Sequence, residues 1–127
     1  MASAKLFVYG TLKRGGDLHY EITAQKLRFL GPAKIQGRLF RIAGETYPGA
    51  VSTDSEQYIK GELYELPEAA EALKKIDAVE GCDEGLYERK LVNVWIGNRK
   101  TRAWAYFYAK PLKKSVPIAN GDFPVRP

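Results

Sequence analysis

The sequence predicts an α+β domain in which one strong helix packs against a strongly curved or closed sheet. Two observations lead to this class. Several segments show the apolar and polar alternation of strands, without a regular exchange of strands and helices, and one segment, 67–79, has the composition of a stable helix. The chain has 127 residues, the usual size of one domain, so we expect residues 1–127 to form a single domain.

The N-terminal half contains mostly short strand signals. Residues 5–10 form a β-type run, and weaker strand signals cover 28–30 and 37–42, before a loop rich in Gly and Pro at 44–49. Segment 17–25 follows a Gly-Gly breaker and is a short helix candidate.

The C-terminal half contains the clearer strands. Residues 58–66 alternate between apolar and polar side chains, and segments 91–96 and 101–109 read as the two arms of a hairpin. Gly97-Asn98 provides the turn between them.

Segment 67–79 is the strongest helix candidate. Pro67 occupies the first helical position, good helix formers follow, and Gly81 is placed to end the helix as a C-terminal cap. The side chains that share one face at i, i+4 and i+7 are Ala69, Leu73 and Ile76. This face is therefore expected to turn toward the core.

Glu80 stands four residues after Ile76 and falls on the same apolar stripe if the helix continues. Burial and the negative end of the helix dipole would both raise the pKa of its carboxyl group. A carboxyl group with a raised pKa suits general acid–base catalysis near neutral pH. Two alternatives remain: Glu80 is a solvated residue of the last turn, or Asp77, which also touches the stripe, is the functional carboxylate.

The counts of metal-binding and nucleophilic residues exclude several kinds of site. The chain has one histidine, His19, and one cysteine, Cys82, so it cannot close an internal disulfide or supply the usual ligand set of a zinc site. Any serine or cysteine triad would have to use His19. The chemistry is therefore expected to rest on carboxylates, hydroxyls, amines or backbone groups, with no metal.

Charge and hydropathy suggest a soluble protein. The formal net charge is +5, a mild excess that more often serves solubility than nucleic-acid binding. The longest apolar run near the N-terminus, residues 6–9, is too short for a signal segment or a membrane span. We expect a cytoplasmic protein with no nucleic-acid and no membrane partner, and the composition leaves its oligomeric state open.

A glycine-flanked loop follows the first predicted strand, at residues 8–16. Such a loop can present consecutive backbone N–H groups to an anion, with Lys13 and Arg14 adding charge, although an ordinary tight turn fits as well. Gly16-Asp17 stands where a phosphate-binding P-loop has Lys and Ser or Thr, and no G-x-G-x-x-G pattern is present.

Two blocks of this sequence resemble a known family. Residues 7–15, Phe-Val-Tyr-Gly-Thr-Leu-Lys-Arg-Gly, resemble the opening signature of the γ-glutamylcyclotransferase-like family, which includes γ-glutamylamine cyclotransferases and plant AIG2-like proteins. Residues 76–81, with Tyr-Glu-Arg at 87–89 and Val-Asn-Val at 92–94, resemble the family's aspartate, Glu-Gly and Tyr-x-Arg pattern. Shorter agreements at 47–49, 61–64, 105–106 and 121–123 extend the resemblance over nearly the whole chain.

The resemblance implies a small mixed β-barrel with flanking helices and a cavity at one end. It also implies a substrate-binding role for a small set of residues near the first loop, namely Tyr9, Gly10, Thr11 and Leu12, and it places the catalytic glutamate of the family on Glu80. The implied reaction converts a small γ-glutamyl compound to 5-oxoproline and a free amine or amino acid. The substrate's own α-amino group is the nucleophile, so no cofactor is implied.

Several other residues have two interpretations. Tyr87 is expected to line the pocket through its hydroxyl, as Tyr64 and Tyr106 could, although aromatic residues on strands are more often core. His19 is more easily explained as a helix residue and Cys82 as a partly buried structural thiol than as functional groups.

Arg89 is expected to pair with a carboxylate such as Asp77 rather than to bind substrate.

Two competing functions stay open. One is a catalytically silent family member that binds a metabolite or a partner. The other is a nucleic-acid-binding barrel, suggested by aromatic and basic residues on the predicted hairpin, namely Trp95, Trp104, Tyr106, Tyr108, Arg99, Lys100 and Arg102. Strand alternation argues against it, because Trp104, Tyr106 and Tyr108 share one face and the basic residues gather at the turn.

Overall fold

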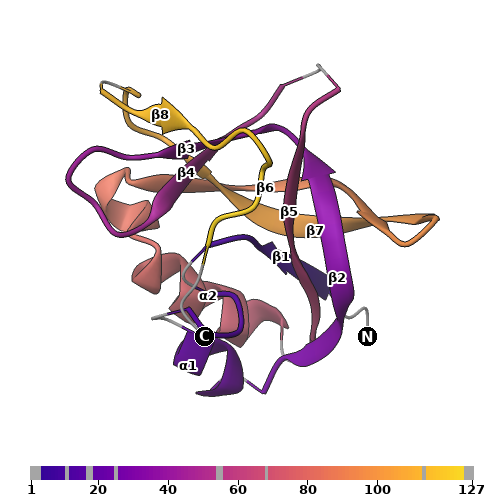
Figure 1. Cartoon of the computed structure of the whole chain (residues 1–127). Helices are drawn as coiled ribbons and strands as arrows, with labels where there is room; N and C mark the ends of the chain where they lie inside the picture. Colours follow the sequence, from indigo (N-terminus) through magenta and orange to yellow (C-terminus); the bar gives the residue numbers. More distant parts are fainter. Residues whose placement is uncertain are drawn as a thin grey trace.

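A computed structural model describes residues 4–10, 12–16, 19–24, 26–53, 56–67, 69–112 and 114–124. Five strands close into a barrel in the order β1-β5-β2-β6-β7 (Figure 1). Their bounds are β1 Ala4–Val8, β2 Arg28–Gln36, β5 Tyr58–Leu66, β6 Tyr87–Ile96 and β7 Arg99–Tyr108. Neighbours are antiparallel except β1 and β7, which pair in parallel between Leu6 and Trp104. The predicted α+β class and the mixed barrel are therefore confirmed.

Strand β1 is buried on both of its faces. Phe7 and Tyr9 belong to the cluster of side chains that fills the barrel, whereas Leu6 and Val8 belong to a second cluster shared with helix α2. Because both faces are covered, the last three residues of this strand, Leu6, Phe7 and Val8, are all apolar and do not alternate.

A smaller sheet extends beside the barrel in the order β4-β3-β8. It consists of β3 Arg38–Arg41, β4 Pro48–Val51 and β8 Val116–Pro117. Strand β4 begins inside the segment expected to be a loop, and Pro48 is its first residue, a position that proline tolerates. The segment after β8 continues along β3, where the N–H of Ile118 donates to the carbonyl of Leu39 over 2.7 Å.

Two helices, α1 His19–Ala24 and α2 Ala69–Val79, lie together at one end of the barrel (Figure 1). Helix α2 buries Ala72, Leu73 and Ile76, which largely matches the predicted stripe. Gly81 ends this helical segment with a left-handed φ of 70° and precedes the short 3-10 helix η1, Cys82–Glu84. In the part of the chain that the structure describes, every helix is too short and too polar to cross a membrane.

Candidate active site

A small pocket lies where β1 ends beside the C-terminal end of α2. It is lined by Phe7, Val8, Tyr9, Gly10, Leu12, Tyr47, Pro48, Glu80, Tyr87 and Tyr106. The structure thus brings Glu80 together with four of the residues predicted to bind substrate. The fifth, Thr11, lies outside the described residues.

Glu80 keeps the phase of helix α2 although the helix itself ends at Val79. Its N–H donates to the carbonyl of Ile76 over 2.9 Å, the i to i−4 bond of an α-helix. This bond directs the carboxyl group into the pocket, as the helical spacing predicts. Burial and, to a smaller extent, the negative charge of Asp77 raise the pKa of Glu80 from 4.5 to about 7. Near neutral pH the carboxyl group can therefore both accept and donate a proton.

Asp77 is held in place by three hydrogen bonds. The hydroxyl of Tyr106 donates to its Oδ1 over 2.6 Å. Arg89 donates through Nε to Oδ1 over 2.9 Å and through Nη2 to Oδ2 over 3.2 Å. This fork confirms the expected pairing of Asp77 with Arg89. Asp77 is not part of the pocket lining, so it acts on Glu80 through its charge and not through direct contact with the pocket.

Two tyrosines around the pocket donate hydrogen bonds from their hydroxyl groups to backbone carbonyls of the protein. Tyr9 donates to the carbonyl of Tyr106 over 2.6 Å, and the hydroxyl of Tyr87 donates to the carbonyl of Pro48. Burial raises the pKa of Tyr9 and of Tyr87 well above the ordinary range. These phenols therefore stay neutral, and they offer the pocket mainly ring surface.

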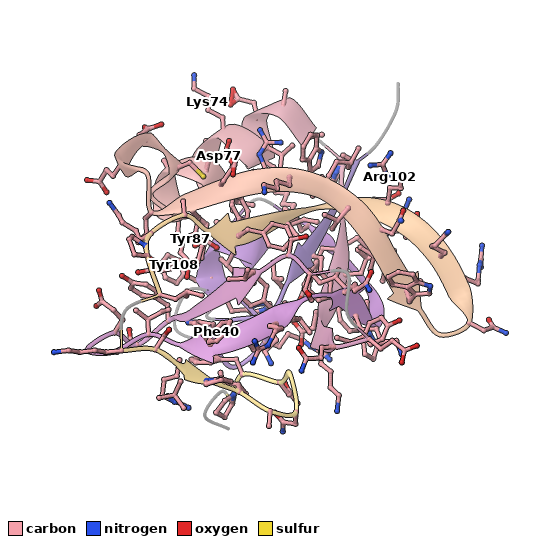
Figure 2. All side chains as sticks on the ribbon, turned by 90° about the horizontal axis from the view of Figure 1, so that it is seen from above. Phe40, Lys74, Asp77, Tyr87, Arg102 and Tyr108 are labelled. Atoms are coloured by element: carbon pink, nitrogen blue, oxygen red, sulfur yellow. The ribbon has the colours of Figure 1, made fainter. Side chains whose placement is uncertain are left out.

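The aromatic wall continues outward from Tyr87. Its ring makes edge contacts with Tyr47 and Tyr108, with centroid distances of 6.1 Å and 5.7 Å. Figure 2 shows Tyr87 and Tyr108 next to each other, with Asp77 on the neighbouring helix. The rings of Tyr47 and Tyr87 line the pocket, and burial is the larger cause of the raised pKa of Glu80.

The loop after β1 is fixed by short-range contacts. The N–H of Lys13 donates to the carbonyl of Gly10 over 3.0 Å. His19 Nδ1 lies 2.9 Å from the carbonyl oxygen of Leu12, and because a carbonyl only accepts, this nitrogen carries the hydrogen. Glycine is required at position 10, since a Cβ there would lie 2.9 Å from the ring of Pro48. His19 is thus a helix residue that also holds the loop.

The two basic residues of this loop point to other partners. Lys13 donates to Asp122 Oδ1 over 2.9 Å and to the carbonyl of Phe123 over 2.8 Å, and Arg14 forms an ion pair with Glu62 at 3.4 Å. Neither residue lines the pocket. In this structure carboxylates of other elements engage both residues, which agrees with the alternative of an ordinary tight turn.

Cys82 and Tyr64 also lie outside the pocket lining. Cys82 is partly buried, and burial followed by the charges of Asp77 and Glu80 raises its pKa to about 11. Its thiol therefore stays protonated near neutral pH and is a poor nucleophile, as the structural interpretation expects. Tyr64 donates to Glu62 over 3.0 Å. Within the described residues, no three side chains of His, Cys, Asp or Glu are grouped to hold a metal ion.

Some pocket residues were not predicted as site residues: Phe7, Val8, Tyr47 and Pro48. Tyr47 and Pro48 enter the site because β4 pairs with β3, a pairing that short-range patterns do not reveal. The Tyr-Pro-Gly segment at 47–49 was the available signal, since it agrees with the family pattern.

The fold is a closed mixed barrel, and its pocket holds a carboxyl group with a pKa of about 7. These features define a class of small α+β proteins equipped for acid–base chemistry. The chain belongs to the family described as "Gamma-glutamyl cyclotransferase, AIG2-like", whose model matches residues 6–125.

Individual relatives agree with this assignment. The Drosophila melanogaster protein CG2811 is 32% identical over 136 residues, covering 98% of this chain and 85% of that protein. The gamma-L-glutamyl-butirosin B gamma-glutamyl cyclotransferase of Niallia circulans is 34% identical over 108 residues, covering 81% of this chain and 65% of that enzyme. The crystal structure of YkqA from Bacillus subtilis superimposes with a TM-score of 0.75 at 30% identity, covering 96% of this chain and 40% of that one.

Proposed function

We propose that the protein is a γ-glutamyl cyclotransferase that converts a γ-glutamyl amine or γ-glutamyl amino acid to 5-oxoproline and the free amine. The observation that carries the proposal is the carboxyl group of Glu80, which lies in the pocket with a pKa of about 7. Membership of the family and the name of the Niallia circulans relative support the same reaction class.

The reaction forms one C–N bond and breaks another. Ionised Glu80 takes a proton from the α-ammonium group, and the freed amine attacks the γ-carbonyl of the same molecule. The resulting oxyanion collapses, the bond to the leaving nitrogen breaks, and Glu80 returns its proton to that nitrogen. The ring nitrogen also sheds a second proton, which the released amine takes up in water to become an ammonium ion. No group outside the substrate serves as nucleophile, and ring closure supplies proximity.

The pocket offers groups for holding the substrate as well. The loop at Gly10 and Leu12 lines the pocket and supplies backbone N–H groups for the substrate's α-carboxylate or for the oxyanion. The rings of Tyr9 and Tyr87 would pack on the methylene groups of the glutamyl chain. The leaving group would extend toward the aromatic wall of Tyr47 and Tyr108.

The test is to incubate the protein with a panel of γ-glutamyl amino acids and γ-glutamyl amines and to measure 5-oxoproline. At least one member should give product at a rate proportional to protein concentration. Absence of product across the whole panel would contradict the proposal and favour a catalytically silent, metabolite-binding protein.

Glu80→Gln tests the mechanism, because the amide keeps the size of the side chain but cannot carry the proton. We expect kcat to fall by about 10²- to 10⁴-fold, the usual contribution of a general acid–base group. Glu84→Gln is the matched control, since Glu84 is exposed in η1 and does not line the pocket. Full activity of Glu80→Gln would rule out the proposed role of this residue.

A further inference from the structure

The outer face of the barrel carries a row of cations that the catalytic pocket does not use. Lys34 on β2 stands directly opposite Lys60 on β5 and opposite Trp95 on β6. Trp95 is in turn opposite Lys100 on β7. Neighbouring strands lie about 4.8 Å apart, so three ammonium groups and one indole form a single band across four strands.

Two aromatic rings meet within this band. Tyr58 and Trp95 make an edge contact with centroids 5.8 Å apart, and the ammonium of Lys34 lies 4.5 Å from the centroid of the Tyr58 ring. Tyr58 is 37% exposed. Two amide residues also belong to this band: Gln36 is opposite Tyr58, and Asn93 is opposite Arg102.

Three hollows join into one groove along this face. The largest, of about 830 Å³, is lined by Arg38 and Tyr58 among others and shares Lys34 and Lys60 with the second hollow. The second hollow shares Trp95 with the third, which ends at Arg102. In the parts of these walls that the structure describes, Glu56 is the only acidic residue.

The cations of the groove differ from other basic residues in their partners. Five basic residues elsewhere form ion pairs with carboxylates, namely Lys13, Arg14, Arg28, Arg89 and Lys90. Among the described residues, no carboxylate lies within ion-pair distance of Lys34, Lys60, Lys100, Arg38 or Arg102. Like charges directly opposite each other, as at Lys34 and Lys60, destabilise a sheet. A polyanion laid along the groove would relieve this repulsion.

We propose that the groove binds single-stranded nucleic acid. Its cations would contact phosphates, and Tyr58 and Trp95 would stack on unpaired bases. A groove that crosses four strands fits an extended chain better than a mononucleotide. A duplex keeps its bases stacked on each other, so the two rings would have no partner there.

This proposal departs from the expectation of no nucleic-acid partner, although the alternation argument holds for three of the four hairpin aromatics. Tyr106 is buried, and Trp104 and Tyr108 pack against the helix-side cluster, so these three do not form a binding face. Trp95, the fourth, lines the groove. The ring that completes the groove, Tyr58, comes from β5, a strand distant in sequence, and only the closed barrel brings it to Trp95.

The test is fluorescence anisotropy with labelled oligouridylate and oligothymidylate of about 12 nucleotides, a length within the usual site size. We expect binding that weakens with salt. The double variant Lys34→Ala/Lys60→Ala should lower the slope of log affinity against log salt by about 0.7 for each lysine that contacts a phosphate. Trp95→Ala should weaken binding about tenfold or more at constant salt.

Matched controls separate this groove from general positive charge. Lys74→Ala/Lys75→Ala removes the same charge from exposed positions of α2, and Figure 2 shows Lys74 far from Arg102. Tyr20→Ala removes an aromatic residue that is 60% exposed on α1. These controls should bind like the wild type, and all variants should keep the wild-type circular dichroism spectrum and 5-oxoproline formation.

Three results would overturn the proposal. One is no binding of either oligonucleotide at low salt. Another is an equal loss of affinity in the Lys74/Lys75 control. The third is retention on phosphatidylserine vesicles without oligonucleotide binding, which would assign the face to a lipid surface. Loss of 5-oxoproline formation is a separate result, because the groove residues do not line the catalytic pocket.

Discussion

The raised pKa of Glu80 comes from its surroundings. The titratable groups around it come from several elements: Asp77 from α2, Tyr9 from the end of β1, Tyr87 from β6 and Tyr106 from β7. The three tyrosines stay neutral near pH 7 because burial raises their pKa. Asp77 is therefore the neighbour whose charge can adjust the proton affinity of Glu80.

Asp77→Asn should shift the pH profile of the reaction. Glu80 must be ionised to accept the first proton, so kcat falls as the pH drops through its pKa of about 7. Removal of the Asp77 charge lowers this pKa, and the acid limb should move to lower pH by about one unit. The measurement is the pH dependence of 5-oxoproline formation. Activity at the plateau should also fall, because Arg89 and Tyr106 lose their shared partner.

Glu71→Gln is the control for this shift. It removes the same charge from the first turn of the same helix, about 13 Å further along the axis from Glu80 at 1.5 Å per residue. Its acid limb should coincide with that of the wild type. An unchanged limb in Asp77→Asn would show that Asp77 serves only to hold the fold.

At the scale of elements, a buried lysine joins the first loop to the C-terminal segment. Lys13 is only 8% exposed and holds Asp122 and the carbonyl of Phe123. The same segment is tied to β5, since the N–H of Lys60 donates to the carbonyl of Gly121 over 2.7 Å. The loop that lines the pocket thus depends on residues more than a hundred positions away.

Lys13→Met should loosen this connection. The thioether keeps most of the apolar stem but leaves a buried carbonyl without its donor, so we expect a loss of about 1–3 kcal/mol in the free energy of unfolding. KM should rise more than kcat falls, because the loop faces the substrate and carries no proton. Denaturant titration and steady-state kinetics provide the two measurements.

Asp122→Asn is the milder companion variant. The Asp122 side chain is half exposed, and the bond from Lys13 to Phe123 remains. If Asp122→Asn lowers the free energy of unfolding as much as Lys13→Met does, the effect belongs to the ion pair and not to the buried carbonyl.

Local patterns predicted the elements whose signals are short-range. Strand β5 has the predicted bounds, Tyr58–Leu66, and α2 ends at the predicted residue, Val79. Strand β2 extends beyond the predicted 28–30 to Gln36, because a bulge between Phe29 and Gly31 lets the strand continue past a glycine and a proline. Strands β4 and β8 depend on pairing with β3, and no local pattern encodes that pairing.

The site divides in the same way. Helical phase was enough to select Glu80, because the i to i−4 bond from Glu80 to Ile76 is local. The arrival of Tyr47 and Pro48 depends on the pairing of β4 with β3, a tertiary contact, and it escaped the sequence patterns.

For the whole molecule, the arrangement separates two surfaces. The candidate catalytic pocket lies at the end of the barrel beside α2, whereas the basic groove runs over the outer face of β5, β2, β6 and β7. Among the described residues, the two share no lining residue. Variants of one surface can therefore be used as folding controls for the other.

The buried carboxyl group of Glu80 also makes the stability of the whole fold depend on pH. Its pKa is about 7 in the folded protein against 4.5 ordinarily, so between these values the folded state keeps a proton that the unfolded chain has lost. The stabilisation by this proton is complete below pH 4.5 and is lost as the pH rises through 7. Glu80→Gln cannot ionise and does not show this loss.

The free energy of unfolding of Glu80→Gln should therefore rise relative to the wild type between about pH 5 and pH 8, by up to about 3 kcal/mol at about 1.4 kcal/mol per pKa unit. Urea titrations of both proteins across this range measure the difference. Glu84→Gln, at an exposed position, is the matched control in the same titrations. A difference for Glu80→Gln that stays constant with pH would mean that Glu80 titrates at its ordinary pKa. The acid–base role proposed for it would then lose its physical basis, because a carboxylate of ordinary pKa is a weak base and takes a proton from the α-ammonium group poorly near pH 7.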